Sequence, residues 1–153
     1  MNKEELMLAC SVGFIDYIGI KLTSLEEGHA EGEIEIQPHH LNPGGGLHGG
    51  LLFSIADTIG GFATRTLDVL PTTLSSNMNF LRPTKGTRVL TAKADVIKRG
   101  KNISVVRIDL FNENGVLVAS GASNYSDLSG RVEDESIQVL ETSEKQDENS
   151  VSS

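Results

Sequence analysis

The stretch Asn42-Pro43-Gly44-Gly45-Gly46-Leu47-His48-Gly49-Gly50, with the segment that follows it, decides the fold of this chain. Three consecutive glycines after a proline form a loop without Cβ atoms, so another molecule can approach its backbone closely. The next segment has apolar residues at the positions that make one broad face of a helix: Leu51, Leu52, Ile55, Ala56, Ile59, Phe62 and Ala63. We therefore expect a glycine loop that opens a central helix over residues 50–66.

The remaining stripe of this helix consists mainly of short side chains and glycine: Ser54, Asp57, Thr58, Gly61 and Arg65. A solvated stripe would carry lysine, glutamate and glutamine, which are better helix formers. This composition indicates that something packs against the stripe. Asp57 is the only acid between Glu35 and Asp68, which makes it the local candidate for a general base or a nucleophile. A solvated aspartate on an ordinary helix is the alternative interpretation.

A helix that begins at a glycine loop offers unpaired backbone N–H groups at the positive end of its dipole, where a developing oxyanion is stabilised. A simple turn before a helix is the alternative. Gly49 and Asp57 are eight residues apart, so about 12 Å separates them along a helix. One reacting carbon cannot reach both groups. If both act, they must come from different chains across a two-fold axis.

Composition indicates one domain with a tail. The chain has 153 residues, 38% of them apolar, and a formal net charge of −8. Residues 131–153 carry two basic and seven acidic residues, a net of −5, so we expect a domain at residues 1–129 and a disordered acidic tail at 130–153. The charge argues against a nucleic-acid partner. No apolar run reaches the ~18 residues of a membrane span, so we expect no membrane partner.

Cysteine usage and the N-terminus bear on the compartment. The single Cys10 excludes an internal disulfide and fits a reducing environment. We interpret it as a small core residue rather than a nucleophile. Glu4 and Glu5 stand where a signal peptide would carry only positive charge, so we predict a cytoplasmic protein.

Basic residues gather in one part of the chain. Seven of the thirteen lie between Arg82 and Lys101, where Asp95 is the only acid. They can be solvated strand edges, where lysine also discourages aggregation. Alternatively, they can bind a ligand that bears phosphates.

Hydrophobic periodicity predicts the other elements. They are a short amphipathic helix with an entry turn and six strands, at residues 3–18 and at 20–25, 30–37, 72–81, 89–98, 102–112 and 116–125. The last two strands are joined at Asn114-Gly115, a strong hairpin signal. Because short links join the last four strands, we expect them to form an antiparallel meander. One mostly apolar helix with an antiparallel sheet is an α+β fold in which the sheet wraps the helix.

The motif His48-Gly49-Gly50, with Asp57 nine positions after the histidine and Asn42 ahead of it, resembles the signature of hotdog-fold acyl-CoA thioesterases. The similar branch is the phenylacetate-pathway and thioesterase-superfamily-member-2 type. The similarity covers residues 5–127 and includes Asn79-Phe80-Leu81-Arg82-Pro83, Arg99-Gly100 and Asn112-Glu113-Asn114-Gly115. It implies a hotdog fold, homodimers that commonly pair as dimers of dimers, and an acyl-CoA substrate. We expect no cofactor.

The resemblance also implies roles for matching residues. The backbone N–H of Gly49 would donate to the thioester carbonyl, with Asn42 helping to orient that group. Asp57 would act as base or nucleophile, Ser75 would hold the water, and His48 would support the loop. The residues assigned to substrate and CoA binding are Gly50, Thr58, Gly61, Arg82, Lys85 and Arg99. The family often has Ser or Thr where Gly61 stands, so Thr58 or Ser75 would share that polar role.

Other site chemistries have weaker support. His29, His39 and His40 have no Cys or acid partner at metal-ligand spacing, so we expect no metal site. No Gly-x-Ser-x-Gly elbow occurs, which disfavours a serine hydrolase. A hotdog dehydratase is disfavoured by the His48-Gly49-Gly50 spacing, and a non-catalytic acyl-CoA-binding protein is the alternative to the enzyme. Aryl, phenylacetyl and aliphatic acyl groups all stay open.

Overall fold

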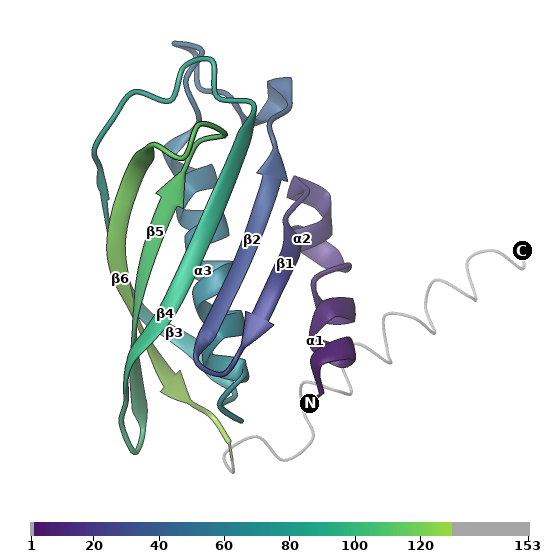
Figure 1. Cartoon of the computed structure of the whole chain (residues 1–153), viewed down its shortest axis with the longest axis vertical. Coiled ribbons are helices and arrows are strands. Elements are labelled where there is room, and N and C mark those ends of the chain that lie inside the picture. The colour runs from purple at the N-terminus through teal and green to yellow at the C-terminus, as the bar shows by residue number, and fades with distance from the viewer. Residues whose placement is uncertain (1, 130–153) are drawn as a thin grey trace, which may run out of the picture.

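The computed structural model of the chain describes residues 2–129, and the acidic segment expected as a tail lies outside the described residues. Six strands form one antiparallel sheet that curls around helix α3 (Figure 1). The elements, in chain order, are α1 (Lys3–Ala9), α2 (Gly13–Ile18), β1 (Lys21–Glu26), β2 (His29–Glu35), a 3-10 helix (Pro38–His40), α3 (Gly49–Arg65), β3 (Pro71–Phe80), β4 (Val89–Arg99), β5 (Ile103–Phe111) and β6 (Leu117–Asp127). The predicted α+β fold, a central helix wrapped by an antiparallel sheet, is confirmed.

The strand order corrects one expectation. The sheet runs β1-β2-β4-β5-β6-β3, so β4, β5 and β6 form a meander, but β3 pairs with β6 and not with β4. The predicted four-strand meander is therefore wrong. Both sides of β4 are occupied, because β2 pairs with it from His29↔Asp95 to Glu35↔Val89 and β5 lies along its other side. The segment 81–88 carries the chain from β3, at the edge of the sheet, back to β4.

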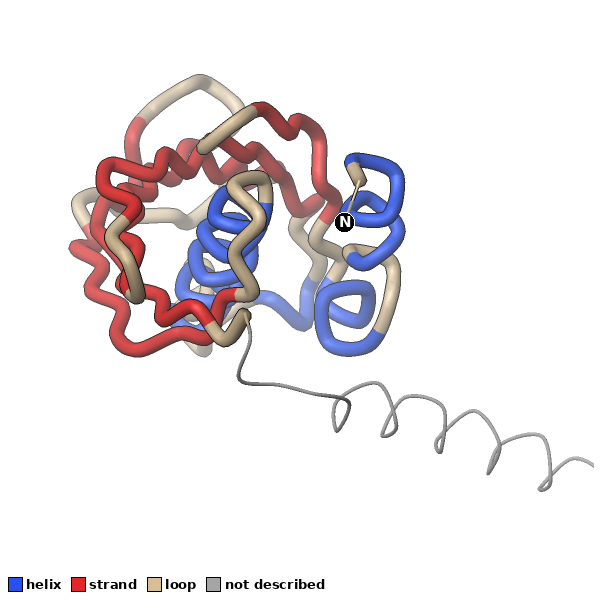
Figure 2. Tube along the Cα trace, turned by 90° about the horizontal axis from the view of Figure 1, so that it is seen from below, coloured by secondary structure: helices blue, strands red, loops and turns tan. Residues whose placement is uncertain are grey.

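Helix α3 lies closely against the sheet. All seven apolar residues predicted for its buried face are at most 7% exposed. Small residues on β2 and β4 face the core, namely Ala30, Gly32, Ala92 and Ala94. A Cβ on Gly32 would lie 2.3 Å from Cδ1 of Ile59, so this close approach requires glycine. Figure 2 shows α3 inside the curled sheet, with α1 and α2 beside it.

The N-terminal segment forms two short helices instead of one. Asn2 and Glu5 make a capping box at the start of α1, and Gly19, with a φ of 84°, ends α2. Cys10 follows α1, is 5% exposed, and burial raises the pKa of its thiol. Its predicted role as a small core residue is confirmed. Within residues 2–129, no helix is both long and apolar enough to cross a bilayer.

The face of β2 and β4 that points away from the core carries a charged cluster that the residue spacing did not reveal. Nδ1 of His29 lies 2.7 Å from Oδ1 of Asp95, and its Nε2 lies 3.2 Å from Oε1 of Glu31. Both bonds form together only when the ring is doubly protonated. Burial opposes protonation, but the two carboxylates outweigh it and raise the pKa of His29 above its ordinary value. His29 therefore has two acid partners in the folded chain.

We expect His29→Ala to lower the Tm more at about pH 6 than at about pH 9. A folded-state pKa above the ordinary 6.5 means that the stabilisation is complete below that value and is lost as the pH rises through the folded value. Thermal melts at the two pH values measure the difference. The control is Lys21→Ala, an exposed position on β1, the strand that pairs with β2. Equal losses at both pH values would show that the packing of His29, and not its charge, stabilises the fold.

Candidate active site

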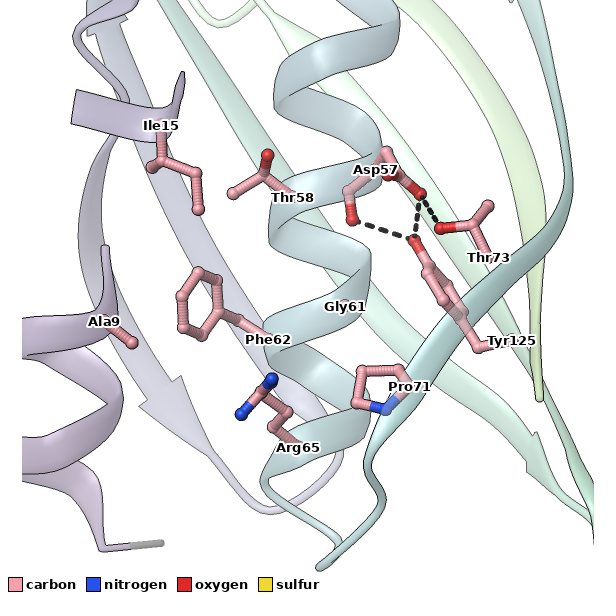
Figure 3. A pocket seen from close by; sticks show the side chains of 10 residues that line it. All are labelled: Ala9, Ile15, Asp57, Thr58, Gly61, Phe62, Arg65, Pro71, Thr73 and Tyr125. Carbon is pink, nitrogen blue, oxygen red and sulfur yellow. Dashed lines mark hydrogen bonds between the residues drawn. The ribbon is translucent and has the colours of Figure 1, made fainter. Parts of the chain in front are cut away.

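The polar stripe of α3 faces a pocket rather than a flat solvated surface. The pocket has a volume of about 260 Å³, and Figure 3 shows the side chains that line it. Helix α3, strand β3 and strand β6 supply Asp57, Thr58, Gly61, Arg65, Thr73 and Tyr125. Ala9 and Ile15 line it from the two N-terminal helices. The structure thus brings together three of the predicted site residues, Asp57, Thr58 and Gly61.

The carboxylate of Asp57 is held through one of its oxygens. The Thr73 hydroxyl donates to Oδ1 of Asp57 at 2.7 Å. The Tyr125 hydroxyl donates to the backbone oxygen of Asp57 at 2.9 Å and lies 3.3 Å from the same Oδ1 (Figure 3). Both of these side-chain hydrogen bonds reach Oδ1, and neither of them reaches Oδ2.

Tyr125 is a buried residue of β6 that is 1% exposed. Burial, and then the nearby charge of Asp57, raise the pKa of its phenol far above the ordinary value. The hydroxyl therefore stays protonated and remains a hydrogen-bond donor at neutral pH.

Hydrogen bonds from the side chain of Asn42 to the loop backbone hold the glycine loop in shape. Its Oδ1 accepts from the backbone N–H groups of Gly44 at 2.9 Å and Gly46 at 3.1 Å. Its Nδ2 donates to the carbonyl of Leu47 at 3.4 Å. The loop is tied to the segment before β4, because the N–H of Leu47 donates to Oγ1 of Thr84 at 2.9 Å. Within one chain, Asn42 positions the loop.

Gly49 begins helix α3, one residue earlier than predicted. Its N–H belongs to the first turn, where the helix itself supplies no acceptor. His48 is the N-cap residue, and its Nδ1 accepts from the N–H of Gly50 at 2.9 Å. A second cavity of about 390 Å³ is lined by His48 and Gly50 together with Phe14 and Tyr17 of α2. Asp57 does not line that cavity.

Four of the predicted site residues are thus separated from Asp57 within one chain. Gly49 and Asp57 lie on the same helix, eight residues and about 12 Å apart. Asn42, His48 and Gly50 lie with Gly49 at the N-terminal end of α3. The separation expected from the sequence is present in the folded chain.

Ser75 lies outside the Asp57 pocket. It is exposed on β3, and its hydroxyl accepts from Nδ2 of Asn124 at 2.8 Å. A register shift between Thr73 and Ser75 interrupts the pairing with β6, so the strict alternation of a regular strand does not hold there. Within one chain, Thr73 and not Ser75 is hydrogen-bonded to Asp57, and the water-holding role that the resemblance implies for Ser75 stays a prediction.

Thr73 and Tyr125 are the site residues that sequence reasoning missed. The irregularity in β3 has no recognisable signal in the residues around it. Tyr125 reaches Asp57 only through the pairing of distant strands. Gly60 was the one available signal, because a glycine inside a segment that otherwise favours a helix indicates that a side chain of another element packs closely against it.

The predicted phosphate-binding residues lie at two ends of the sheet. Nη1 of Arg82 donates to the carbonyl of Leu117 at 2.7 Å, and Lys85 lies against the glycine loop, with Cε 3.6 Å from where a Cβ on Gly45 would stand. Arg99 ends β4, whose eleven residues span roughly 33 Å. One small ligand cannot touch both ends of β4 in a single chain.

Comparisons with known proteins identify the family and the fold. Residues 44–119 match the model of the thioesterase superfamily. The acyl-coenzyme A thioesterase PaaI of Escherichia coli is 33% identical over 102 residues, which cover 67% of this chain and 73% of that protein. A thioesterase structure from Haemophilus influenzae has a TM-score of 0.75 and 29% identity, and the match covers 88% of this chain and 95% of that one.

A thioesterase protein from Streptococcus pneumoniae, solved with coenzyme A, matches with a TM-score of 0.68 and 28% identity over 71% of this chain and 85% of that one. The fold is therefore the hotdog fold of thioester-cleaving enzymes. The chain belongs to the thioesterase superfamily and is a thioester hydrolase.

Proposed function

We propose that this protein hydrolyses acyl-CoA thioesters to the free acid and CoA, with Asp57 as general base or nucleophile. The observation that carries the proposal is the Asp57 carboxylate, held on Oδ1 by Thr73 and Tyr125 at the wall of a pocket. A carboxylate restrained in this way presents one oxygen to a water or to a thioester carbon. The relatives named acyl-CoA thioesterase and the neighbour solved with coenzyme A support this substrate class.

The reaction needs a polarised carbonyl and an activated nucleophile. The N–H of Gly49 would donate to the thioester oxygen, a contact that typically lowers such barriers by about 3–4 kcal/mol. In the general-base route, water loses a proton to Asp57 as it adds to the carbonyl carbon, the C–S bond then breaks, and the departing CoA thiolate takes up that proton. In the nucleophilic route, Asp57 adds to the carbonyl carbon and the C–S bond breaks, so that CoA leaves, takes a proton from water, and a mixed anhydride stays on Asp57 until a second water cleaves it to the free acid and the carboxylate. Asn42 holds the loop that presents Gly49, and His48 caps the same helix.

We infer that the complete site combines Gly49 of one chain with Asp57 of a second copy. The distance along α3 keeps the two groups apart in one chain. Strand β3 supports a dimer, because it is an edge strand of ten residues with one side unpaired in the described sheet. Its apolar Leu74 and Phe80 are 55% and 51% exposed. Such an edge is a template for pairing with another copy.

The proposed activity is tested by titrating the thiol released from aryl-, phenylacetyl- and aliphatic-CoA substrates. We expect release from at least one of these classes by the wild-type protein and none above background with Asp57→Asn. Binding of acyl-CoA without thiol release would favour the non-catalytic alternative.

We expect the basic residues Arg82 and Arg99 to strengthen the binding of the acyl-CoA substrate. We expect the double variant Arg82→Ala, Arg99→Ala to raise KM for acyl-CoA about fivefold or more while kcat changes less, because phosphate contacts bind ground and transition states alike. Added salt should weaken binding in the same direction by screening. The two single variants show which end of the sheet holds the phosphates, and Lys21→Ala, an exposed position on β1, is the control. An unchanged KM in the double variant would mean that these residues are only strand surface.

A further inference from the structure

The hydroxyl of Tyr125 makes an unusual pair of contacts with a single residue. It donates to the backbone oxygen of Asp57 at 2.9 Å and lies 3.3 Å from that residue's Oδ1. Because one acceptor is on the backbone and the other on the side chain, the hydroxyl ties the carboxylate to its own helix. The rotation of the Asp57 side chain is thereby restricted.

Helix α3 has a glycine, Gly60, at the point where this hydroxyl approaches it. A Cβ on Gly60 would lie 2.4 Å from the Tyr125 hydroxyl oxygen and 3.2 Å from its Cζ. Glycine is a poor residue for the interior of a helix, so its presence there needs a packing reason. With a larger residue at position 60, the Tyr125 hydroxyl would have to move away from the helix, as would the Ile108 side chain, whose Cδ1 would lie 2.9 Å from the added Cβ.

The surroundings of Tyr125 keep its hydroxyl protonated, so that it remains a hydrogen-bond donor. Burial, followed by the charge of Asp57, raises the pKa of the phenol, which stays neutral. The charged and titratable groups that line the pocket with Asp57 are Tyr125 from β6 and Arg65 from α3. Thr73 supplies a second donor to the same Oδ1. Two neutral donors on one oxygen leave Oδ2 to face the reacting atoms.

We propose that Tyr125 is a positioning residue of the thioesterase site, which acts with Gly60 to hold Asp57 in the orientation that presents Oδ2 to water or to the thioester carbon. This rests on the proposed catalytic role of Asp57. Tyr125 acts through Asp57 and gives up no proton in the reaction.

The test is Tyr125→Phe, which removes the hydroxyl and keeps the ring. We expect kcat to fall about tenfold, the loss that goes with one hydrogen bond to a charged group, with KM within about twofold of wild type. The acid limb of the pH profile of kcat/KM should move to higher pH, because the ionised carboxylate has lost a donor. A tyrosine that only fills the core would change the Tm without moving the pH profile.

The matched control is Ser120→Ala on the same strand. Ser120 also donates a hydroxyl to a carboxylate, since its Oγ lies 2.5 Å from Oδ1 of Asp109. We expect its kcat and pH profile to stay at wild-type values. An equal loss of kcat in Ser120→Ala and Tyr125→Phe would overturn the proposal, because any disturbed bond on β6 would then suffice.

A second variant keeps the proposal testable if Tyr125→Phe folds poorly. Gly60→Ala forces the hydroxyl away from Asp57 while the tyrosine is retained, and it should show the same fall in kcat and the same shift of the acid limb. Adding Tyr125→Phe to Gly60→Ala should cost little further activity, because both changes remove one contact. If the two changes instead lowered kcat independently, so that their fold losses multiplied in the double variant, the proposal would be overturned.

The outcomes also separate this inference from the proposed function. Wild-type kcat and pH profile in Tyr125→Phe, alongside an inactive Asp57→Asn, would overturn the role of Tyr125 and leave that of Asp57 intact. A fully active Asp57→Asn would overturn both.

Discussion

Replacing Asp57 with asparagine should lower kcat at least about 100-fold, the contribution that a general base typically makes. The change is nearly isosteric and removes only the basic oxygen. The hydroxyls of Thr73 and Tyr125 can still donate to the amide oxygen at the place of Oδ1. We therefore expect the fold and the binding of acyl-CoA to be retained, because the pocket keeps its shape.

Thiol release under saturating substrate gives kcat, and thermal melts and acyl-CoA binding verify the fold of the variant. Asp68→Asn is the matched control. It makes the same change three residues after α3 ends, outside the Asp57 pocket, at a φ of 56° that asparagine tolerates well. Near-normal turnover in a folded Asp57→Asn protein would show that the carboxylate is not the catalytic group.

Mixing two inactive variants should restore activity if the site spans two chains. Asn42→Ala loosens the loop that presents Gly49, and Asp57→Ala removes the base, so each homodimer should be nearly inactive. When the two variants are unfolded together and refolded, about half of the dimers are mixed. In a mixed dimer, one site combines both defects and the other combines two intact residues.

Random pairing therefore predicts about a quarter of wild-type activity in the refolded mixture, since half of the dimers each have one good site of two. Each variant unfolded and refolded alone shows how much activity the procedure itself restores. Size-exclusion chromatography verifies that dimers have formed. If both residues served one site within a chain, no mixture could regain activity. Dimers that stay inactive after mixing would contradict the two-chain mechanism.

The central helix could be predicted in detail because its signals are local. The apolar spacing from Leu51 to Ala63, the glycine loop and the short polar stripe all lie within about twenty residues, and α3 begins and ends within one residue of the expectation. The strands follow from alternation in the same way. The order of the strands in the sheet cannot be predicted in this way, because alternation shows which face of a strand is buried and does not show which strand pairs with it. For that reason the pairing of β3 with β6 was missed.

The sequence by itself determined the α+β class, the buried face of α3, the candidate Asp57 and its separation from Gly49, because each depends on residues close together in the chain. Only the tertiary structure decided that Thr73 is hydrogen-bonded to Asp57, that the Tyr125 hydroxyl reaches Asp57 where Gly60 leaves room for it, and that Arg82 and Arg99 lie at different ends of β4. These contacts join elements far apart in sequence. Strand register, one irregularity in β3 and the closeness of helix to sheet set them, and none of these is a property of a short stretch of residues.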